Sequence, residues 1–294
     1  MSLFMGFQPL DEGVATQGRR SVITMDFYTI LSDVYDDLFP AEPSILRFLT
    51  DTFSSCQRVL DVACGTGTYT IPLWEQGKDV VGIDLSLPMI EQARGKLQKM
   101  FGRLAQGTSD KSPTTPQGRE TDFPKAPADI FQIGDMQDLS RIPPGSFQGL
   151  YCIGNSLPHL DSESQIRLAL KQFLRVLSPG GVLLLQTINF DRVRFDHSGR
   201  FALPTLKGRR AELARFYTSG SDSDHLYFES ELSLPDGKRM RNRIPLFLLT
   251  RNRLEAWLQD AGFGSQMWYG SYERKAYEPD TSFLSIVVAR VRGT

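Results

Sequence analysis

The sequence predicts an α/β fold, in which a doubly wound, mostly parallel seven-stranded sheet carries a small antiparallel β insertion. Two observations support this prediction. Short apolar, β-branched runs alternate with helical patterns between residues 57 and 190, which is the rhythm of βαβ units. After residue 190 strand patterns follow one another directly, as in antiparallel sheets, before one helix and two strands complete the chain.

The N-terminal region predicts two helices. Apolar residues recur at spacings of three and four from Phe27 to Leu38, and a second helical pattern covers 45–53. Pro40 and Pro43 separate the two patterns. Residues 1–24 show no sustained period, so we expect a disordered or vector-derived arm there.

The next stretch predicts the first βαβ units. A β-branched run ends just before Gly65, and Pro88 stands where a helix would begin. Residues 102–128 are crowded with Ser, Thr, Pro and Gly and have no apolar period, which predicts a flexible insertion. The elements expected here are strands over 58–62 and 79–84 and helices over 68–76 and 88–101.

The pattern then resumes after the insertion. Ser162 and Gln165 have the spacing of a capping box, and Pro235-Asp236-Gly237 is typical of a hairpin turn. Gly262 closes the last helix. The expected strands are 130–133, 149–153, 182–188, 214–217, 226–234, 239–249, 267–272 and 283–291, and the expected helices are 163–177 and 250–261.

The length of 294 residues suits two domains or one large domain with an insertion. We therefore predict a nucleotide-binding domain over 25–190 and 250–294, with 191–249 as a β-rich insertion that covers the substrate. That insertion carries more Lys and Arg than Asp and Glu. Its positive balance indicates either a solvated face or arginines that meet an anionic acceptor.

Composition excludes several classes of function. Lys and Arg number 33 against 34 Asp and Glu, so no basic excess exists to grip nucleic acid or anionic lipid. Three cysteines are too few for a secreted disulfide framework, and no apolar run approaches the ~18 residues of a membrane span. We expect a cytoplasmic protein without nucleic-acid or membrane partners, and its oligomeric state stays open.

The stretch after the first predicted strand indicates a nucleotide site. Gly65 and Gly67 allow a tight turn whose backbone N–H groups can approach a ligand closely. Asp84 ends the next strand, where its carboxylate can accept hydrogen bonds from ribose hydroxyls. In open α/β sheets ligands bind at the carboxyl ends of the strands, so these residues should meet there.

A dinucleotide-dependent dehydrogenase is one alternative. Its fingerprint needs a third glycine three residues after Gly67, where this chain has Thr70. Asp61, just before the turn, would repel a pyrophosphate. A carboxylate there suits a ligand that carries a cation, and S-adenosylmethionine has an ammonium and a sulfonium besides its ribose.

At these residues the chain resembles the class I S-adenosylmethionine-dependent methyltransferases. Asp61-x-x-Cys64-Gly65-x-Gly67 matches their first motif, and Gly82-Ile83-Asp84-Leu85-Ser86-x-x-Met89-Ile90 is similar to the second. Gly134-Asp135-Met136 resembles the third, and 174–185 resembles their helix, turn and fifth strand. The four motifs occur in the correct order, and the resemblance covers residues 27–190 and 250–292.

The resemblance implies a role for each motif. The two glycines would line the methionine moiety, Asp61 would lie on its ammonium side and Asp84 would hold the ribose. Asp135 and Met136 would hold the adenine, and Tyr35 resembles the residue that closes over the cofactor. The cofactor-binding residues predicted on this basis are Tyr35, Asp61, Ala63, Gly65, Gly67, Asp84, Leu85, Met89, Asp135, Met136 and Ile153.

The acceptor side resembles glycine N-methyltransferase-like enzymes. Their loop after the fourth strand carries Asn, Ser and His at the spacing of Asn155, Ser156 and His159, and Asn189-Phe190-Asp191 resembles their Asn-Tyr-Asp. The chain departs at Ile188, where the glycine-methylating enzymes place an arginine for the substrate carboxylate. Arg192 or Arg194 could replace that charge. The predicted substrate-binding residues are Asn155, His159, Asn189, Arg192 and Arg194.

Methyl transfer is an in-line displacement, so alignment and desolvation are the main demands on the protein. His159 is the candidate base because an unperturbed imidazole titrates near pH 6.5, and Asn155 could orient the acceptor. The competing interpretations are a loop histidine bonded to backbone and a turn-forming asparagine. Three scattered histidines and three cysteines form no ligand set, so we expect no metal.

The sequence therefore predicts an S-adenosylmethionine-dependent methyltransferase that acts on a small polar molecule, at nitrogen rather than oxygen or carbon. The alternatives are a non-catalytic S-adenosylmethionine-binding regulator, an NAD-dependent dehydrogenase and a methyltransferase of RNA or protein. The neutral charge weighs against RNA.

Overall fold

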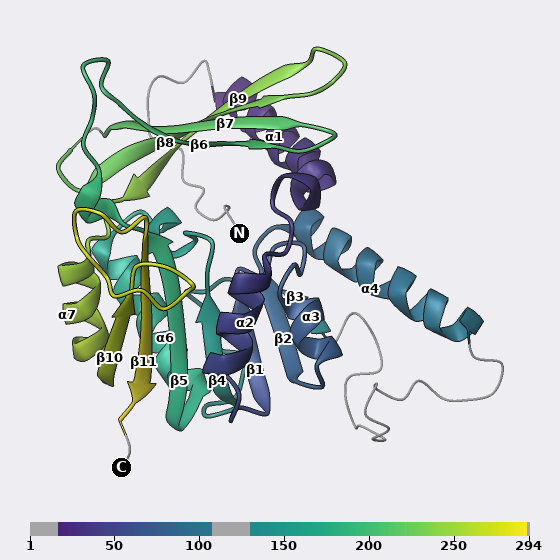
Figure 1. The fold of residues 1–294 in the computed structure, drawn as a ribbon, viewed down its shortest axis with the longest axis vertical. Coiled ribbons are helices and arrows are strands. Elements are labelled where there is room, and N and C mark those ends of the chain that lie inside the picture. The colour runs from purple at the N-terminus through teal and green to yellow at the C-terminus, as the bar shows by residue number, and fades with distance from the viewer. Residues whose placement is uncertain (1–16, 108–129, 221, 293–294) are drawn as a thin grey trace.

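A computed structural model describes residues 17–107, 130–220 and 222–292 (Figure 1). At its centre is a seven-stranded sheet in the order β10-β11-β5-β4-β1-β2-β3. Its neighbours pair in parallel except that β11 runs antiparallel to β5 and β10, which confirms the predicted sheet. The strands are β1 (Arg58–Val62), β2 (Asp79–Asp84), β3 (Phe131–Ile133), β4 (Phe147–Cys152), β5 (Leu177–Ile188), β10 (Phe263–Tyr269) and β11 (Leu284–Val291).

Helices cover both faces of this sheet. Successive residues of β1 point to opposite faces: Val59 packs in a cluster with Phe48 of α2, and Leu60 packs in a cluster with Phe173 of α6. Burial on both sides is why the strands read as continuous apolar runs. The helices are α1 (Gln17–Leu38), α2 (Pro43–Thr52), α3 (Thr70–Glu75), α4 (Leu87–Gly107), α6 (Glu163–Val176) and α7 (Arg251–Ala261).

The strand order reverses between β1 and β4. From β1 the chain proceeds outward to β2 and β3, whereas β4 lies on the other side of β1 and leads to β5. The loops that follow β1 and β4 therefore diverge at the carboxyl ends of the strands. A crevice at such a switch point is where open α/β sheets bind their ligands.

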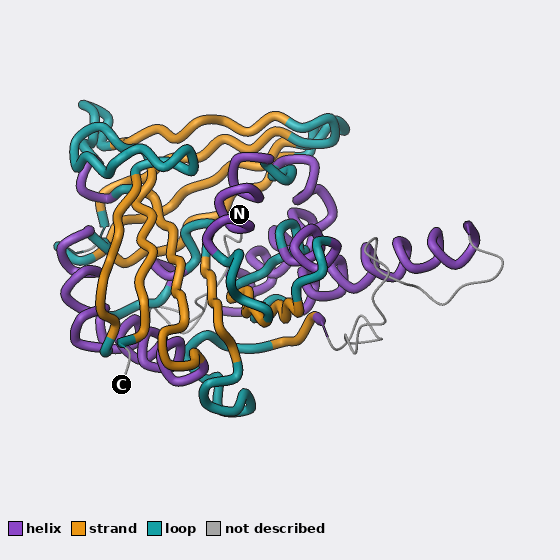
Figure 2. The backbone as a smooth tube through the Cα atoms, turned by 60° about the horizontal axis from the view of Figure 1, so that its bottom comes forward, coloured by secondary structure: helices purple, strands orange, loops and turns teal. Residues whose placement is uncertain are grey.

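A second, four-stranded antiparallel sheet lies across the carboxyl ends of the parallel strands (Figures 1 and 2). We call it the covering sheet. It consists of β6 (Arg200–Lys207), β7 (Glu212–Ser219), β8 (His225–Ser233) and β9 (Arg239–Phe247), paired in chain order. Burial alternates strictly along β8, as expected for a sheet with one face toward the core and one toward solvent.

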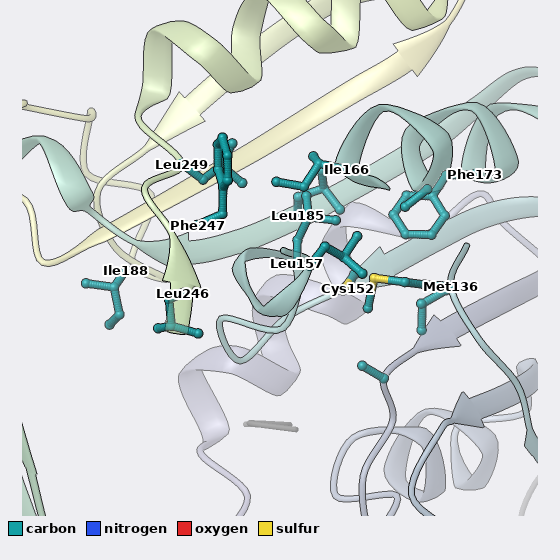
Figure 3. Packing of buried hydrophobic residues seen from close by; sticks show 14 of the residues in the cluster. Met136, Cys152, Leu157, Ile166, Phe173, Leu185, Ile188, Leu246, Phe247 and Leu249 are labelled. Carbon is teal, nitrogen blue, oxygen red and sulfur yellow. The ribbon is translucent and has the colours of Figure 1, made fainter. Parts of the chain in front are cut away.

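The base of the covering sheet joins the main core. Figure 3 shows Leu246 and Phe247 at the end of β9 in the same apolar cluster as Ile188 of β5. Leu157 continues this cluster toward Cys152 and Met136 at the ends of the parallel strands. The two sheets thus share one hydrophobic core, which holds the covering sheet in place over the strand ends.

Two sequence expectations about the elements were wrong, and one strand was missed. Helix α1 begins at Gln17, so 17–24 are helical and do not belong to a loose arm, and residues 1–16 lie outside the described residues. Helix α4 extends to Gly107, so only 108–129 of the expected insertion lie outside them. Strand β6 was not predicted, because it is an edge strand with Leu203 as its only buried residue and Pro204 within it.

Candidate active site

The loop after β1 makes a tight left-handed turn. Ala63, Gly65 and Gly67 all have positive φ, at 61°, 56° and 76°. A Cβ at Gly67 would come within 2.5 Å of the Phe131 ring, so packing as well as backbone conformation demands glycine there. The turn predicted from the two glycines is present at the carboxyl end of β1.

Asp84 ties this turn to the next strand. Its buried carboxylate accepts a hydrogen bond from the Gly65 N–H at 2.8 Å through Oδ2 and one from the Ser86 N–H at 2.9 Å through Oδ1. A carboxylate that accepts hydrogen bonds from two backbone N–H groups is held in a single orientation. The predicted ribose-binding acid is therefore fixed at the mouth of the switch point.

Asp61 lies beneath the turn. Its Oδ2 accepts hydrogen bonds from the Thr70 hydroxyl at 2.6 Å and the Tyr151 hydroxyl at 2.8 Å, and the side chain is fully buried. Burial raises its pKa to about 7, although the two hydroxyls favour the charged form. The residue that replaces the third dehydrogenase glycine, Thr70, thus serves to brace this acid.

A third carboxylate reaches the turn from α1. Asp36 accepts a hydrogen bond from the Thr66 hydroxyl at 2.6 Å and forms an ion pair with Lys96 of α4 at 2.8 Å. Lys96 also donates to the Thr66 hydroxyl. Sequence reasoning missed Asp36, since an acid on an amphipathic helix carries no local signal of its partner 30 residues away.

Tyr35 faces the site from the same helix. The side chain is buried, and its hydroxyl has no hydrogen-bond partner in the described part of the chain. Burial raises its pKa well above the usual value, and the charges of Asp84 and Asp36 raise it further. The residue predicted to close over the cofactor therefore lies close enough to Asp84 to interact with its charge.

The remaining predicted cofactor residues, among them Asp135 and Met136 for the adenine, follow β2, β3 and β4 in the chain. Met89, Met136 and Ile153 are buried, and Asp135 accepts a hydrogen bond from the Gln137 N–H at 2.8 Å. Leu85 is 45% exposed and Ile133 51% exposed, and Ile133 pairs in register with Asp84. Exposed apolar side chains beside a fixed carboxylate are suited to a flat base attached to a ribose.

The loop after β4 is hydrogen-bonded to β5 and to the covering sheet. Asn155 has φ 66°, accepts a hydrogen bond from the Ile188 N–H at 2.9 Å and is hydrogen-bonded to Tyr217 of β7. Gln186 accepts one from the Gly154 N–H at 2.7 Å. Asn155 therefore connects the loop after β4 to β5 and to β7 of the covering sheet. It does so from a left-handed turn conformation.

His159 ends the short 3-10 helix η1 (Leu157–His159) and is buried, with no partner for Nε2 in the described part of the structure. Burial lowers its pKa to about 3. An imidazole this weakly basic is neutral at physiological pH and is a poor acceptor for the proton of an amine. The low pKa is unfavourable for the base role, which stays a prediction from the sequence.

The remaining predicted substrate contacts have other partners. Asn189 uses both amide donors on the carbonyls of Pro279 and Ser282, and its oxygen accepts from the Asp191 N–H and the Tyr277 hydroxyl. Arg192 stacks on the rings of Phe201 and Phe283. Arg194 is exposed and donates to the carbonyls of Asp191 and Val193. We therefore do not carry these three residues forward as acceptor ligands.

Other features of the described residues point elsewhere. An open hollow of about 430 Å³ is lined by α1 and by the β6–β7 and β8–β9 turns and includes none of the motif residues. Within the described ranges no three His, Cys, Asp or Glu side chains are grouped to hold a metal ion. No helix found among them has the length and apolar character needed to cross a membrane.

Comparison with known proteins agrees with this geometry. A family model described as a methyltransferase domain matches residues 60–185. Glycine N-methyltransferase of Homo sapiens is 33% identical over 142 residues, which cover 47% of this chain and 43% of that enzyme. The glycine/sarcosine N-methyltransferase of Parasynechococcus marenigrum is 28% identical over 222 residues, 76% of this chain and 68% of that enzyme.

The fold has solved counterparts. The crystal structure of an S-adenosylmethionine-dependent methyltransferase from Clostridium acetobutylicum matches with a TM-score of 0.66 at 16% identity, over 91% of this chain and 100% of that one. Fold and strand-end site together define a nucleoside-binding α/β protein. The chain carries a class I S-adenosylmethionine-dependent methyltransferase domain, which confirms the resemblance read from its motifs, and S-adenosylmethionine is the methyl donor of that class. The matched segment spans less than half of the human enzyme.

Asp61→Asn tests whether the buried acid supplies charge to the cofactor. A ligand cation favours the ionised carboxylate, so we expect wild-type affinity for S-adenosylmethionine to rise as the pH passes through about 7. The variant should lack this rise and bind about tenfold more weakly at pH 8, a loss of roughly 1.4 kcal/mol. Titration calorimetry between pH 6 and 8 measures the pH dependence of the affinity and the difference between the two proteins. If the affinity of the wild type does not change with pH, Asp61 has only a structural role.

His159→Asn tests the neutral histidine. Its folded pKa, about 3, lies below the unfolded value near 6.5, so wild-type stability falls as the pH drops from 6.5 toward 3. The variant should show a shallower loss, by up to about 1.4 kcal/mol per pH unit. Urea unfolding from pH 7 to 4 measures the difference; equal slopes would show that His159 is protonated in the folded protein.

Proposed function

We propose that this protein transfers the methyl group of S-adenosylmethionine to the nitrogen of a small polar amine. The observation that carries the proposal is the pair of buried carboxylates at the glycine turn. Asp61 and Asp84 come from neighbouring strands and bond to residues of the turn or its immediate continuation, whereas the charge of Asp36 is balanced by Lys96. Such a site attracts an ammonium and a sulfonium and repels the pyrophosphate of a dinucleotide.

The described residues fit the cofactor. Asp84 would hold the ribose, Leu85 and Met136 the adenine, and the turn from Ala63 to Gly67 the methionine moiety. The Tyr35 hydroxyl, for which the described residues offer no hydrogen-bond partner, would provide a buried donor from α1. When bound, S-adenosylmethionine supplies a methyl carbon already activated by the sulfonium.

The chain's own contribution is then alignment and exclusion of water. The covering sheet, α1 and the loop at Asn155 enclose the strand ends on which the acceptor would lie. An amine must reach the methyl carbon without its proton, and His159 is too weakly basic to remove it. The acceptor therefore enters in its neutral form, and the rate should follow the amine's own titration.

Nitrogen as the acceptor atom is supported by the relatives. The curated proteins that the chain matches include glycine and glycine/sarcosine N-methyltransferases. Ile188, however, stands where the sequence resemblance to those enzymes implies an arginine. The proposal accordingly extends to the class of small amines and not to glycine itself.

Asp84→Asn, with Asp79→Asn as the matched control, tests the proposal. Both acids lie on β2, at opposite ends, and Asp79 pairs with Arg58 away from the site. Loss of a charged hydrogen-bond partner costs about 1.5–3 kcal/mol, so we expect Asp84→Asn to bind S-adenosylmethionine at least tenfold more weakly. The control should bind as the wild type does, and thermal melts would exclude unfolding of either variant.

Methyl transfer itself is measured with methyl-labelled S-adenosylmethionine and a mixture of small amines. Labelled N-methyl product with the wild type, reduced with Asp84→Asn, is the expected result. Tight binding of S-adenosylmethionine without product would favour the non-catalytic regulator. Binding of NADH without S-adenosylmethionine would overturn the proposal.

A further inference from the structure

The inner face of the covering sheet carries one polar row among apolar ones. Cross-strand pairing aligns Leu203, Arg215, Ser230 and Asn242 across β6 to β9. The neighbouring rows are apolar: Leu213 pairs with Leu232, and Tyr217 pairs with Phe228. Arg215, Ser230 and Asn242 are all buried. A polar row on a buried face is informative, because buried polar side chains need partners.

Arg215 is the charged member of this row and forms no ion pair with a carboxylate of residues 17–107, 130–220 or 222–292. The residue is 7% exposed; Nη2 donates to the Pro204 carbonyl at 2.7 Å, and Cζ lies 5.8 Å from the centre of the Phe39 ring. Nε has no partner, nor does the Ser230 hydroxyl beside it, among the residues that the structure describes. Burial lowers the pKa of the guanidinium, which shows the cost of holding a cation there.

The arginines of β9 behave differently. Arg241 and Arg239 pair with Glu231, and Arg243 pairs with Glu229, and the three arginine side chains are each more than half exposed. They lie on the solvent side of the sheet, and their charge is balanced. Arg215 is therefore not part of a general positive surface, and its position on the inner side needs a separate explanation.

Its neighbours place Arg215 between the two halves of the site. The Phe39 ring that the guanidinium faces stacks on Tyr35, with 4.7 Å between the ring centres, and Tyr217 lies two residues along β7 on the same buried face. Tyr35 also lies near Asp84, and Tyr217 is hydrogen-bonded to Asn155. Arg215 thus lies between Tyr35, on the side of the predicted cofactor residues, and Tyr217, on the side of the acceptor loop.

We propose that Arg215 binds a carboxylate of the methyl acceptor, with Ser230 as a further donor, so that the acceptor is an amine that also carries a carboxylate. This inference rests on the proposed function and names the substrate class of the same site. A carboxylate would complete the unpaired guanidinium by a charge-assisted bond. It would also supply, from the covering sheet, the positive charge that Ile188 does not offer at the end of β5.

The test compares Arg215→Gln and Arg215→Lys with the wild type and with Arg241→Gln, an exposed control on β9. Methyl transfer is measured on pairs of probes. Each pair consists of an amino acid (a proteinogenic amino acid, sarcosine or β-alanine) and the corresponding carboxamide, which lacks the negative charge. We expect the wild type to prefer the carboxylate member at least tenfold in kcat/KM. Arg215→Gln should remove that preference through KM, and Arg215→Lys should retain part of it.

Two further measurements distinguish a binding role of Arg215 from a structural one. Affinity for S-adenosylmethionine should be unchanged in all variants, since none of the residues assigned to the cofactor belongs to the covering sheet. The melting temperature of Arg215→Gln should not fall, because the variant removes an uncompensated buried cation. If Arg215→Gln does not fold, the preference for carboxylate over carboxamide in the wild type and in Arg215→Lys still tests the proposal.

The outcomes are distinct. Equal wild-type rates on acids and amides would overturn the role of Arg215 and leave the proposed N-methyltransferase intact. Loss of S-adenosylmethionine affinity in Arg215→Gln, with acceptor preference unchanged, would also overturn it by assigning the arginine to the cofactor. If neither the amino acids nor their carboxamides are methylated, the proposed function is overturned instead.

Discussion

The carboxylate of Asp84 is the interaction on which the rest of the site depends. It accepts backbone N–H groups from the turn after β1 and from the start of the loop after β2. These two loops follow neighbouring strands, β1 and β2, at the carboxyl edge of the sheet. One buried anion with two backbone donors fixes both, and the same anion is available to a ribose.

Around this anchor the site is assembled from elements distant in sequence. Helix α1 contributes Asp36 and Tyr35, and Lys96 of α4 holds Asp36 against the turn. An ion pair at this partly exposed place contributes little to stability by itself. Its effect is geometric, because it sets the N-terminal helix over the turn and with it the Tyr35 hydroxyl.

The covering sheet supplies the other wall. Apolar rows on its inner face join the main core, and one polar row interrupts them. Packing alone would favour an apolar residue at Arg215, since a buried unpaired cation is costly. A structure tolerates that cost where a ligand compensates it, and in our proposal the carboxylate of the acceptor does so, while Asp61 and Asp84 at the ends of the parallel strands meet the cofactor.

The sequence by itself determined the order of elements, the mostly parallel sheet and the turn with its two acids. These features follow from local periodicity and from residues close together in the chain, such as Gly65, Gly67 and Asp84. Only the tertiary structure decided which side chains share the crevice. Asp36 and Arg215 carry no local signal, because their meaning depends on partners far along the chain and on which face of an element they occupy. For the same reason burial, invisible in a motif, makes His159 a neutral side chain and commits Asn189 to internal hydrogen bonds.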